Sequence, residues 1–176
     1  MEPSGFGRLL CGSTVWEDAV KVIATTNTMW RQTVRMIELL VAKCGRDGAF
    51  PTQDDVARFS AEELQRDCRL GYRAKSMRAL SEVDLESVAD YRTLAGVGPY
   101  GTAHLLAMDG VHADIAVDTE FRRFVRETYH GGRKVSDAAM LRRYAKWGRW
   151  KYLAYWSESW NGVAAALQPA QAGGGK

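Results

Sequence analysis

The stretch that decides the fold is residues 94–124, which read LAGVGPYGTAHLLAMDGVHADIAVDTEFRRF. It begins with a tight turn in which Gly96 and Gly98 can adopt positive φ and allow the backbone to approach a ligand closely. Pro99 suits the first position of a helix, because its missing N–H would have no helical partner there. The helix expected over residues 100–108 therefore presents backbone N–H groups at its amino end. Such an end binds anions, and a nucleic-acid phosphate fits it.

Asp118 is the second informative residue of this stretch. It follows the extended run Ile115–Val117 and precedes residues 119–124, which have a helical pattern. An Asp at that place is a candidate N-cap, and the helix dipole favours its charged form. A carboxylate so placed can stabilise a developing cation or orient a water molecule that attacks one. The alternative is that Asp118 caps the helix and does nothing else.

Together, LAGVGPYGTA and VDTEFRRF resemble the helix-hairpin-helix DNA glycosylases, which include endonuclease III and 8-oxoguanine DNA glycosylase. The resemblance implies that Asp118 drives cleavage of the N-glycosidic bond. It also implies that the hairpin contacts the DNA backbone. The hairpin residues assigned to this contact are Gly96, Val97, Gly98 and Gly101.

Position 100 narrows the class of glycosylase. Members that also nick the DNA strand have a Lys at this point of the hairpin helix, and its amine forms a Schiff base with the sugar. This chain has Tyr100, and a phenol cannot form an imine. The resemblance therefore implies a monofunctional enzyme that uses water and leaves an abasic site. The alternative for Tyr100 is simple packing against its helix neighbours.

The segment ATTNTMW, residues 24–30, resembles the one from which glycosylases insert a polar side chain into the space left by a flipped base. Asn27 would be that side chain, because its amide offers a donor and an acceptor to the orphaned partner base. Alternatively, Asn27 or Thr28 simply caps the helix that begins near Trp30.

The segment LGYRAK, residues 70–75, resembles LGYRAR of 8-oxoguanine DNA glycosylase. By that resemblance Tyr72 wedges into the base stack and Arg73 reads the widowed base. Lys75 keeps the charge of the second Arg and is assigned to the DNA interface as well. Without the hairpin and Asn27, Tyr72 would be interpreted as an ordinary surface aromatic residue.

We assign the base pocket to Tyr100 and His104, one turn apart on one helix face, and to Trp150 among the carboxyl-terminal aromatic residues. A lone His is more often structural than catalytic, so His104 is assigned to the pocket lining only. Asn27, Tyr72 and Arg73 together suggest an oxidised purine opposite C as the target. An alkylated purine or a deaminated base stays open, because no pocket residue is diagnostic.

The chain departs from its relatives in three places. It has Gln32 five residues after Asn27, where the 8-oxoguanine enzymes have an Arg, and Val22 where the adenine-specific branch has a Glu. The endonuclease III branch ends in a four-Cys iron–sulfur loop. The three Cys of this chain instead all precede the hairpin, and none is spaced as a metal-ligand pair. We therefore expect no iron–sulfur cluster, no metal site and no cofactor, although a structural monovalent cation at the hairpin is compatible with the pattern.

Composition agrees with a globular DNA-binding protein. The chain has 176 residues, 46% of them hydrophobic, which is enough for one substantial core. An odd number of unclustered Cys suggests a reducing, intracellular location in the cytoplasm or nucleoid. No signal peptide or apolar run of transmembrane length is evident. We expect a monomer whose partner is double-stranded DNA that contains a damaged base, with no membrane association.

Charge is distributed unevenly along the chain. Residues 121–151 contain ten Lys and Arg against two acidic residues, whereas residues 47–90 contain ten acidic residues against six basic ones. Such asymmetry is typical of a surface that binds a polyanion. The alternative is a solvated helix face, which the interleaved Trp and Tyr residues of this region make less attractive.

The hydrophobic pattern predicts an all-α fold in one domain, residues 1–167, followed by a disordered tail over residues 168–176. The expected helices cover residues 16–25, 30–44, 84–91, 100–108, 119–129, 136–147 and 150–167, with helix starts at Thr52 and Ser60. The resemblance divides the domain into two helical lobes with a DNA-binding cleft between them. One lobe spans about residues 23–108, and the other joins residues 1–22 to residues 111–167.

Two other functions remain open at this point. A non-catalytic helix-hairpin-helix module would bind DNA through the same hairpin, but it would not need Asp118, Asn27 and Tyr72 together. A bifunctional glycosylase/lyase would need another amine, such as that of Lys75 or Lys151.

Overall fold

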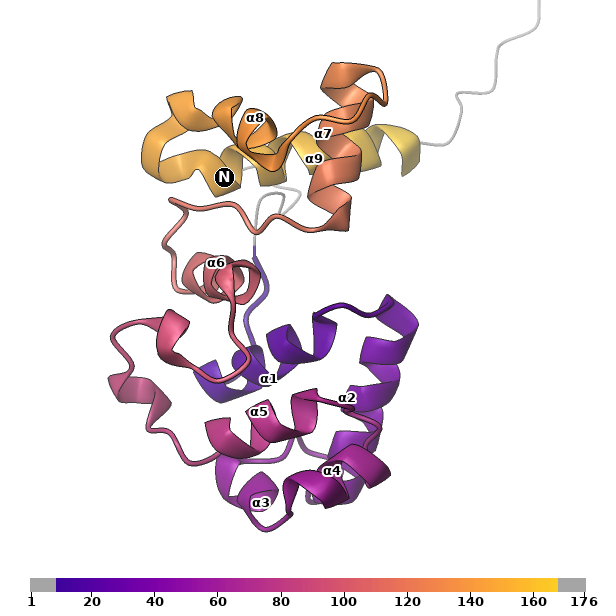
Figure 1. Cartoon of the computed structure of the whole chain (residues 1–176), viewed down its shortest axis with the longest axis vertical. Helices are drawn as coiled ribbons and strands as arrows, with labels where there is room; N and C mark the ends of the chain where they lie inside the picture. The colour runs from indigo at the N-terminus through magenta and orange to yellow at the C-terminus, as the bar shows by residue number, and fades with distance from the viewer. Residues whose placement is uncertain (1–8, 168–176) are drawn as a thin grey trace, which may run out of the picture. The chain divides into compact units, whose positions relative to one another are not determined.

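The computed structural model describes residues 9–167, with side chains described as far as Trp160, and these residues form helices only (Figure 1). The all-α prediction is confirmed. The described residues divide into two compact units, one of residues 10–110 and one that contains residues 111–167.

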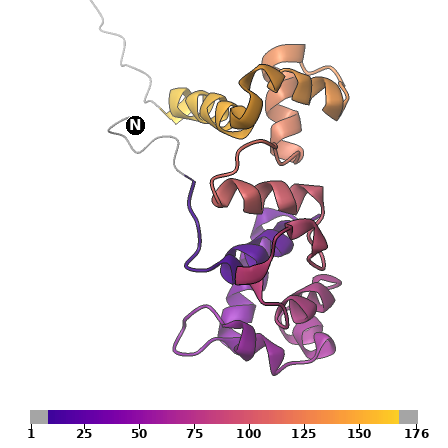
Figure 2. The ribbon, with the colours of Figure 1, turned by 90° about the vertical axis from the view of Figure 1, so that its left-hand side faces the viewer.

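The unit of residues 10–110 consists of six α-helices and two short 3₁₀ turns. They are α1 (Val15–Thr25), α2 (Trp30–Cys44), α3 (Gln53–Ala57), α4 (Ala61–Asp67), α5 (Arg73–Leu80), η1 (Leu85–Ser87), η2 (Tyr91–Thr93) and α6 (Pro99–Met108). Helix α1 packs against α2, α5 and α6, so it lies at the centre of this unit (Figures 1 and 2). The sequence predicts a helix over residues 84–91, but only the two 3₁₀ turns form there.

The position of α1 differs from the expected lobe boundary. The sequence assigned residues 10–22 to the other lobe, yet they belong to the same unit as the hairpin. The reason is burial: Trp16, Val20 and Ile23 are at most 5% exposed in the core of this unit. The indole N–H of Trp16 also donates a hydrogen bond to the carbonyl of Pro51 at 2.7 Å. Moving α1 elsewhere would expose all of these side chains to water.

The predicted helix starts at Thr52 and Ser60 are confirmed. In α3 the Thr52 hydroxyl accepts from the N–H of Asp55, whose carboxylate accepts from the N–H of Thr52 in return. Ser60 and Glu63 form the same reciprocal pair at the start of α4. Both are capping boxes, which satisfy two backbone donors that the helix itself leaves unpaired.

The unit that contains residues 111–167 is built from α7 (Thr119–His130), α8 (Asp137–Arg142), the 3₁₀ segment η3 (Ala145–Trp150) and α9 (Lys151–Leu167). Its aromatic core includes Phe121, Tyr144 and Tyr155, with the rings of Phe121 and Tyr155 edge to face at 5.1 Å. Helix α7 ends at His130, and Gly131 follows as its C-cap in the left-handed conformation that glycine favours.

Helix α8 is shorter than predicted, because the sequence favoured one helix over residues 136–147. The chain instead leaves α8 after Arg142 and continues in 3₁₀ geometry, with a sharp turn at Gly148 (φ 52°, ψ −123°). The run Ile115–Val117 pairs with no strand in the part of the chain that the structure describes. Among the described helices, none combines the length and the apolar character needed to cross a membrane.

Candidate functional site

The predicted hairpin lies between η2 and α6. The carbonyl of Leu94 accepts a hydrogen bond from the N–H of Val97 at 3.1 Å, which closes the turn. Gly96 has φ +82°, as its sequence position suggested, but Gly98 has φ −88° and acts as the N-cap of α6. Pro99 occupies the first turn of that helix, as predicted. Only Gly96 therefore needs the left-handed region that favours glycine.

The four hairpin residues assigned to the DNA contact differ from one another in exposure. Gly96 and Gly98 are exposed, whereas Val97 and Gly101 are buried. A Cβ on Gly101 would lie 3.2 Å from a methyl carbon of Val22 and 3.2 Å from one of Val97, so Gly101 permits the close approach of α6 to α1. The exposed backbone at Gly96 and Gly98 is the part of the hairpin that a phosphate could reach. The DNA contacts themselves stay predictions.

Tyr100 and His104, the two pocket candidates of α6, touch each other. Their rings lie edge to face with centroids 4.6 Å apart, and both side chains are half-buried. The Tyr100 hydroxyl lies 3.3 Å from the hydroxyl of Thr25, near the end of α1. The last residue of helix α1 thus contacts the Tyr100 phenol.

Two residues predicted from separate segments, Asn27 and Tyr72, meet at the turn between α1 and α2. Nδ2 of Asn27 donates to the Tyr72 hydroxyl at 3.4 Å, and the hydroxyl of Thr26 lies 3.3 Å from the same oxygen. These hydrogen bonds, the one from Thr26 first, lower the pKa of Tyr72 from its usual value. Tyr72 is nevertheless 61% exposed, so its ring and the Asn27 amide are presented to solvent together.

The neighbouring cations of α5 differ in exposure. Lys75 is exposed, as a residue that contacts phosphate would be. Arg73 is only 7% exposed, and its guanidinium donates to the carbonyls of Thr26 and Leu70. It is therefore engaged with the protein's own backbone. Sequence reasoning missed this, because a Tyr-Arg pair does not reveal which carbonyls lie nearby.

Asp118 is the N-cap of α7, as predicted. Its Oδ1 accepts a hydrogen bond from the N–H of Phe121 at 2.6 Å, and the side chain is half-buried. Its other oxygen forms no hydrogen bond with a described residue. Burial first, and the Asp118 charge second, raise the pKa of Tyr155 well above its usual range. The neighbouring Arg122 is held by Asp137 through a two-pronged ion pair at 2.9 Å. A carboxylate anchored by one oxygen and open at the other can act on a cation or a water molecule.

Trp150, the third pocket candidate, lies at the end of η3 in the same unit as Asp118. Its ring is 48% exposed, with the guanidinium carbon of Arg149 4.8 Å from its centroid. The ring of His112 lies 6.1 Å away on the inner side, and burial lowers the pKa of that imidazole. The exposed part of Trp150 is available for stacking.

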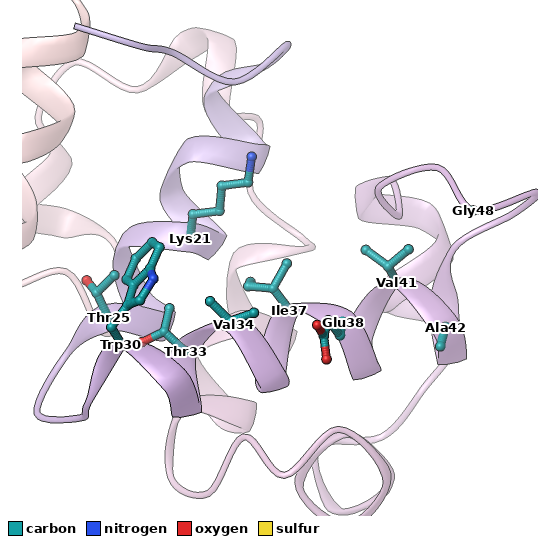
Figure 3. Close-up of a pocket in the computed structure, with 10 residues that line it drawn as sticks. All are labelled: Lys21, Thr25, Trp30, Thr33, Val34, Ile37, Glu38, Val41, Ala42 and Gly48. Carbon is teal, nitrogen blue, oxygen red and sulfur yellow. The ribbon is translucent and has the colours of Figure 1, made fainter.

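Sequence reasoning also missed an apolar groove of about 620 Å³ on the outer face of α2, shown in Figure 3. Trp30, Val34, Ile37 and Val41 follow one another along it, and Lys21 of α1 stands opposite them. Their helical spacing is typical of a buried stripe, yet Trp30 is 74% and Val34 38% exposed. The lining has almost no polar surface, so the groove is unsuited to recognition of a base edge by hydrogen bonds.

Within the described residues, no group of three or more His, Cys, Asp and Glu side chains is placed to hold a metal ion. Cys44 and Cys68 are buried in the core of the first unit, and Cys11 is exposed; all three are free thiols.

The model of the HhH-GPD superfamily base excision DNA repair proteins matches residues 20–149, a range that includes the Asn27 turn, the hairpin and Asp118. The chain belongs to this superfamily. No curated protein sequence matches the chain.

Solved structures confirm the HhH-GPD fold. The 3-methyladenine DNA glycosylase of Archaeoglobus fulgidus is similar with a TM-score of 0.73 and 20% identity over 91% of this chain. The 8-oxoguanine glycosylase/lyase of Clostridium acetobutylicum, in complex with double-stranded DNA containing cytosine opposite 8-oxoguanine, gives a TM-score of 0.69 and 21% identity over 87%. The chain spans 62% of the length of the archaeal protein and 61% of the clostridial one. At this identity the likeness establishes the fold alone.

Proposed function

We propose that this HhH-GPD protein is a monofunctional DNA glycosylase that binds double-stranded DNA, extrudes a modified purine and hydrolyses its N-glycosidic bond. Family membership supports the reaction class. The observation on which the proposal rests most heavily is Asp118, a carboxylate held at the amino end of α7 with one oxygen uncommitted. The proposal requires no cofactor and a single protein chain.

The mechanism follows from the charge that develops on the sugar. When the glycosidic bond breaks, positive charge accumulates at the anomeric carbon, and a nearby carboxylate lowers the energy of that state. The hydrogen bond from Phe121 fixes the Asp118 carboxylate, so no reorganisation is needed during the reaction. The base leaves with the electron pair of the C–N bond and takes up a proton from water. The uncommitted oxygen of Asp118 orients the water molecule that attacks the cation, and the attacking water loses its proton to the carboxylate or to solvent. Extrusion of the nucleotide costs about a few kcal/mol and is cheapest for damaged or mismatched bases.

The absence of strand cleavage is inferred from Tyr100. A Schiff base requires a nucleophilic amine, and Tyr100 supplies a phenol whose hydroxyl lies beside that of Thr25. The product would therefore be an intact strand with an abasic site.

A modified purine is the substrate class that we favour. The two structurally similar enzymes are named for 8-oxoguanine and 3-methyladenine, both modified purines. The exposed ring of Trp150, the pocket candidate of the unit that contains Asp118, suits a large stacked base.

A panel of duplexes, each with a single lesion, tests this proposal. Base release is measured under single-turnover conditions, with alkali added afterwards to reveal abasic sites. We expect release from at least one modified purine by the wild type. Asp118→Asn should reduce it by about a thousandfold or more, because the amide retains the cap but loses the charge. Asp114→Asn removes a nearby exposed carboxylate of the same unit and should release the base at the wild-type rate.

The panel also separates the alternatives. Release of a pyrimidine lesion alone, such as uracil, would overturn the assignment to modified purines. Tight binding without release of any base would identify a non-catalytic DNA-binding module. Release by Asp118→Asn at the wild-type rate would overturn the mechanism.

A further inference from the structure

Arg73 is buried in an arrangement that is unusual for a cation. Its side chain is 7% exposed, and within the described residues no carboxylate pairs with it. Its partners are the carbonyl of Thr26, the carbonyl of Leu70 at 3.5 Å and the ring of Tyr72, whose centroid lies 4.7 Å from the guanidinium carbon. A buried charge is costly unless it is well hydrogen-bonded. Nε of Arg73 is buried without a hydrogen-bond partner among the described residues, so the hydrogen bonds of Nη1 and Nη2, both to backbone carbonyls, offset the cost only in part.

The backbone that Arg73 contacts includes the turn between α1 and α2. Thr26 ends α1 in an extended conformation, and Asn27 follows with φ +47°, in the left-handed region that Asn tolerates better than most residues. The Thr26 carbonyl lies beyond the helix and needs a donor, which Arg73 supplies. Tyr72 adds its hydroxyl to Thr26 and Asn27 from the same side.

The opposite side of the turn is closed by Gln32. Its Oε1 accepts from the hydroxyl of Thr28 at 2.7 Å and from the N–H of Met29 at 3.4 Å. Arg73 and the side-chain oxygen of Gln32 both engage the turn itself. The Asn27 amide is exposed, and its oxygen, unlike that of Gln32, forms no hydrogen bond with a described residue.

From this geometry we infer that Arg73 is a positioning residue, which holds the turn so that the Asn27 amide alone meets the base opposite the lesion. The inference rests on the proposed function in that it assumes DNA with a vacated base position. It replaces the expectation that Arg73 itself reads the widowed base. A single amide can donate and accept, and every nucleobase offers both kinds of group. The protein should therefore discriminate weakly among the four opposite bases.

Equilibrium binding tests the inference without any catalysis. The probes are four duplexes that contain a tetrahydrofuran abasic-site analogue opposite A, C, G or T, and an undamaged duplex, followed by fluorescence anisotropy. The wild type should bind the four abasic duplexes within about threefold of one another, which is under 1 kcal/mol. Arg73→Met should weaken all four by a common factor of about ten, so that their ratios stay constant. Selective loss toward one opposite base would show that Arg73 reads that base and would overturn the inference.

Two variants complete the comparison. Asn27→Gly keeps a backbone that adopts positive φ and removes the amide, so it should abolish the preference for abasic over undamaged DNA. Arg78→Met is the matched control: Arg78 lies on the same helix, pairs with Glu82 and does not touch the turn. It should bind the four abasic duplexes as the wild type does.

Hydrogen exchange of the free protein provides a readout that needs no DNA. Arg73→Met should exchange faster over residues 24–32, whereas Arg78→Met should match the wild type. Unchanged exchange in Arg73→Met would overturn the positioning role. If the wild type fails to prefer abasic DNA, the proposed function fails, and the exchange result still decides whether Arg73 holds the turn.

Discussion

Gly96 and Ser76 are so close that no side chain fits between them. A Cβ on Gly96 would lie 2.5 Å from Oγ and 2.6 Å from Cβ of Ser76, and Gly96 also has φ +82°. Two independent requirements therefore impose glycine at this position. Gly98, two residues later, has φ −88° and no atom within 4 Å of a built Cβ. The two glycines of one motif thus have different physical roles.

The first prediction compares the same substitution at both positions. Gly96→Ser should lower the free energy of unfolding by about 1–3 kcal/mol, because it adds a steric clash and a strained φ. Gly98→Ser should be neutral or slightly stabilising, since Ser is a good N-cap and the space is open. Urea denaturation measures both. Equal effects at the two positions would contradict this assignment.

The second prediction uses Gly98 to test the hairpin as a DNA contact. Because Gly98→Val meets no protein atom, it should leave the fold intact while blocking the approach of a phosphate to the backbone. Affinity should fall about tenfold for damaged and undamaged duplexes alike, since backbone contacts contain no sequence information. Binding should also weaken with added salt for both proteins. Unchanged affinity in a titration, with a native circular dichroism spectrum, would remove the hairpin from the interface.

The sequence was sufficient to predict local structure where that structure depends on residues close together in the chain. Pro99 at a helix start, Asp118 at an N-cap and the capping boxes of Thr52 and Ser60 depend on neighbours within about four residues, so their patterns could be interpreted directly. The all-α class and the superfamily followed from the same short motifs.

Features that depend on distant contacts could not be predicted. Arg73 donates to Thr26, 47 residues away, and this contact determines what its charge does. Helix α1 was assigned to the wrong lobe because its apolar stripe indicates burial but not the partner against which it is buried. The sequence also suggested positive φ at Gly98, which has φ −88°. Glycine permits positive φ without requiring it.

The third prediction concerns Glu17, in the first turn of α1, and the stability of the folded protein at acid pH. A hydrogen bond from the Lys21 ammonium, followed by hydrogen bonds from Ser13, lowers the pKa of Glu17 from 4.5 to about 2. A depressed pKa means that the ionised carboxylate stabilises the folded state fully above pH 4.5, and that this contribution is lost as the pH falls toward 2.

The test is the free energy of unfolding of Glu17→Gln and the wild type between pH 7 and pH 2. The wild type should be more stable above about pH 4.5, and the difference should shrink steadily below it. Glu62→Gln, which removes an exposed carboxylate of α4, corrects for the general loss of a negative charge. A difference that does not change with pH would show that Glu17 acts through packing and not through its charge.

The last prediction concerns Tyr100 and the fate of the DNA strand. The wild type should leave an intact strand with an abasic site, which is cut only after alkali or heat, because the residue at the mouth of the hairpin helix is a phenol. Borohydride should trap no covalent complex.

Tyr100→Lys should gain a trappable adduct on abasic DNA, at some loss of base release, because it also removes the contact with Thr25 and the edge-to-face contact with the His104 ring. The gain requires an amine that is partly neutral near pH 7, so it should increase as the pH is raised. Tyr100→Phe, which lacks the hydroxyl but has no amine, is the control and should trap nothing. Nicking by the wild type without alkali, matched by a trapped complex, would show that another residue supplies the amine and that the protein is a lyase.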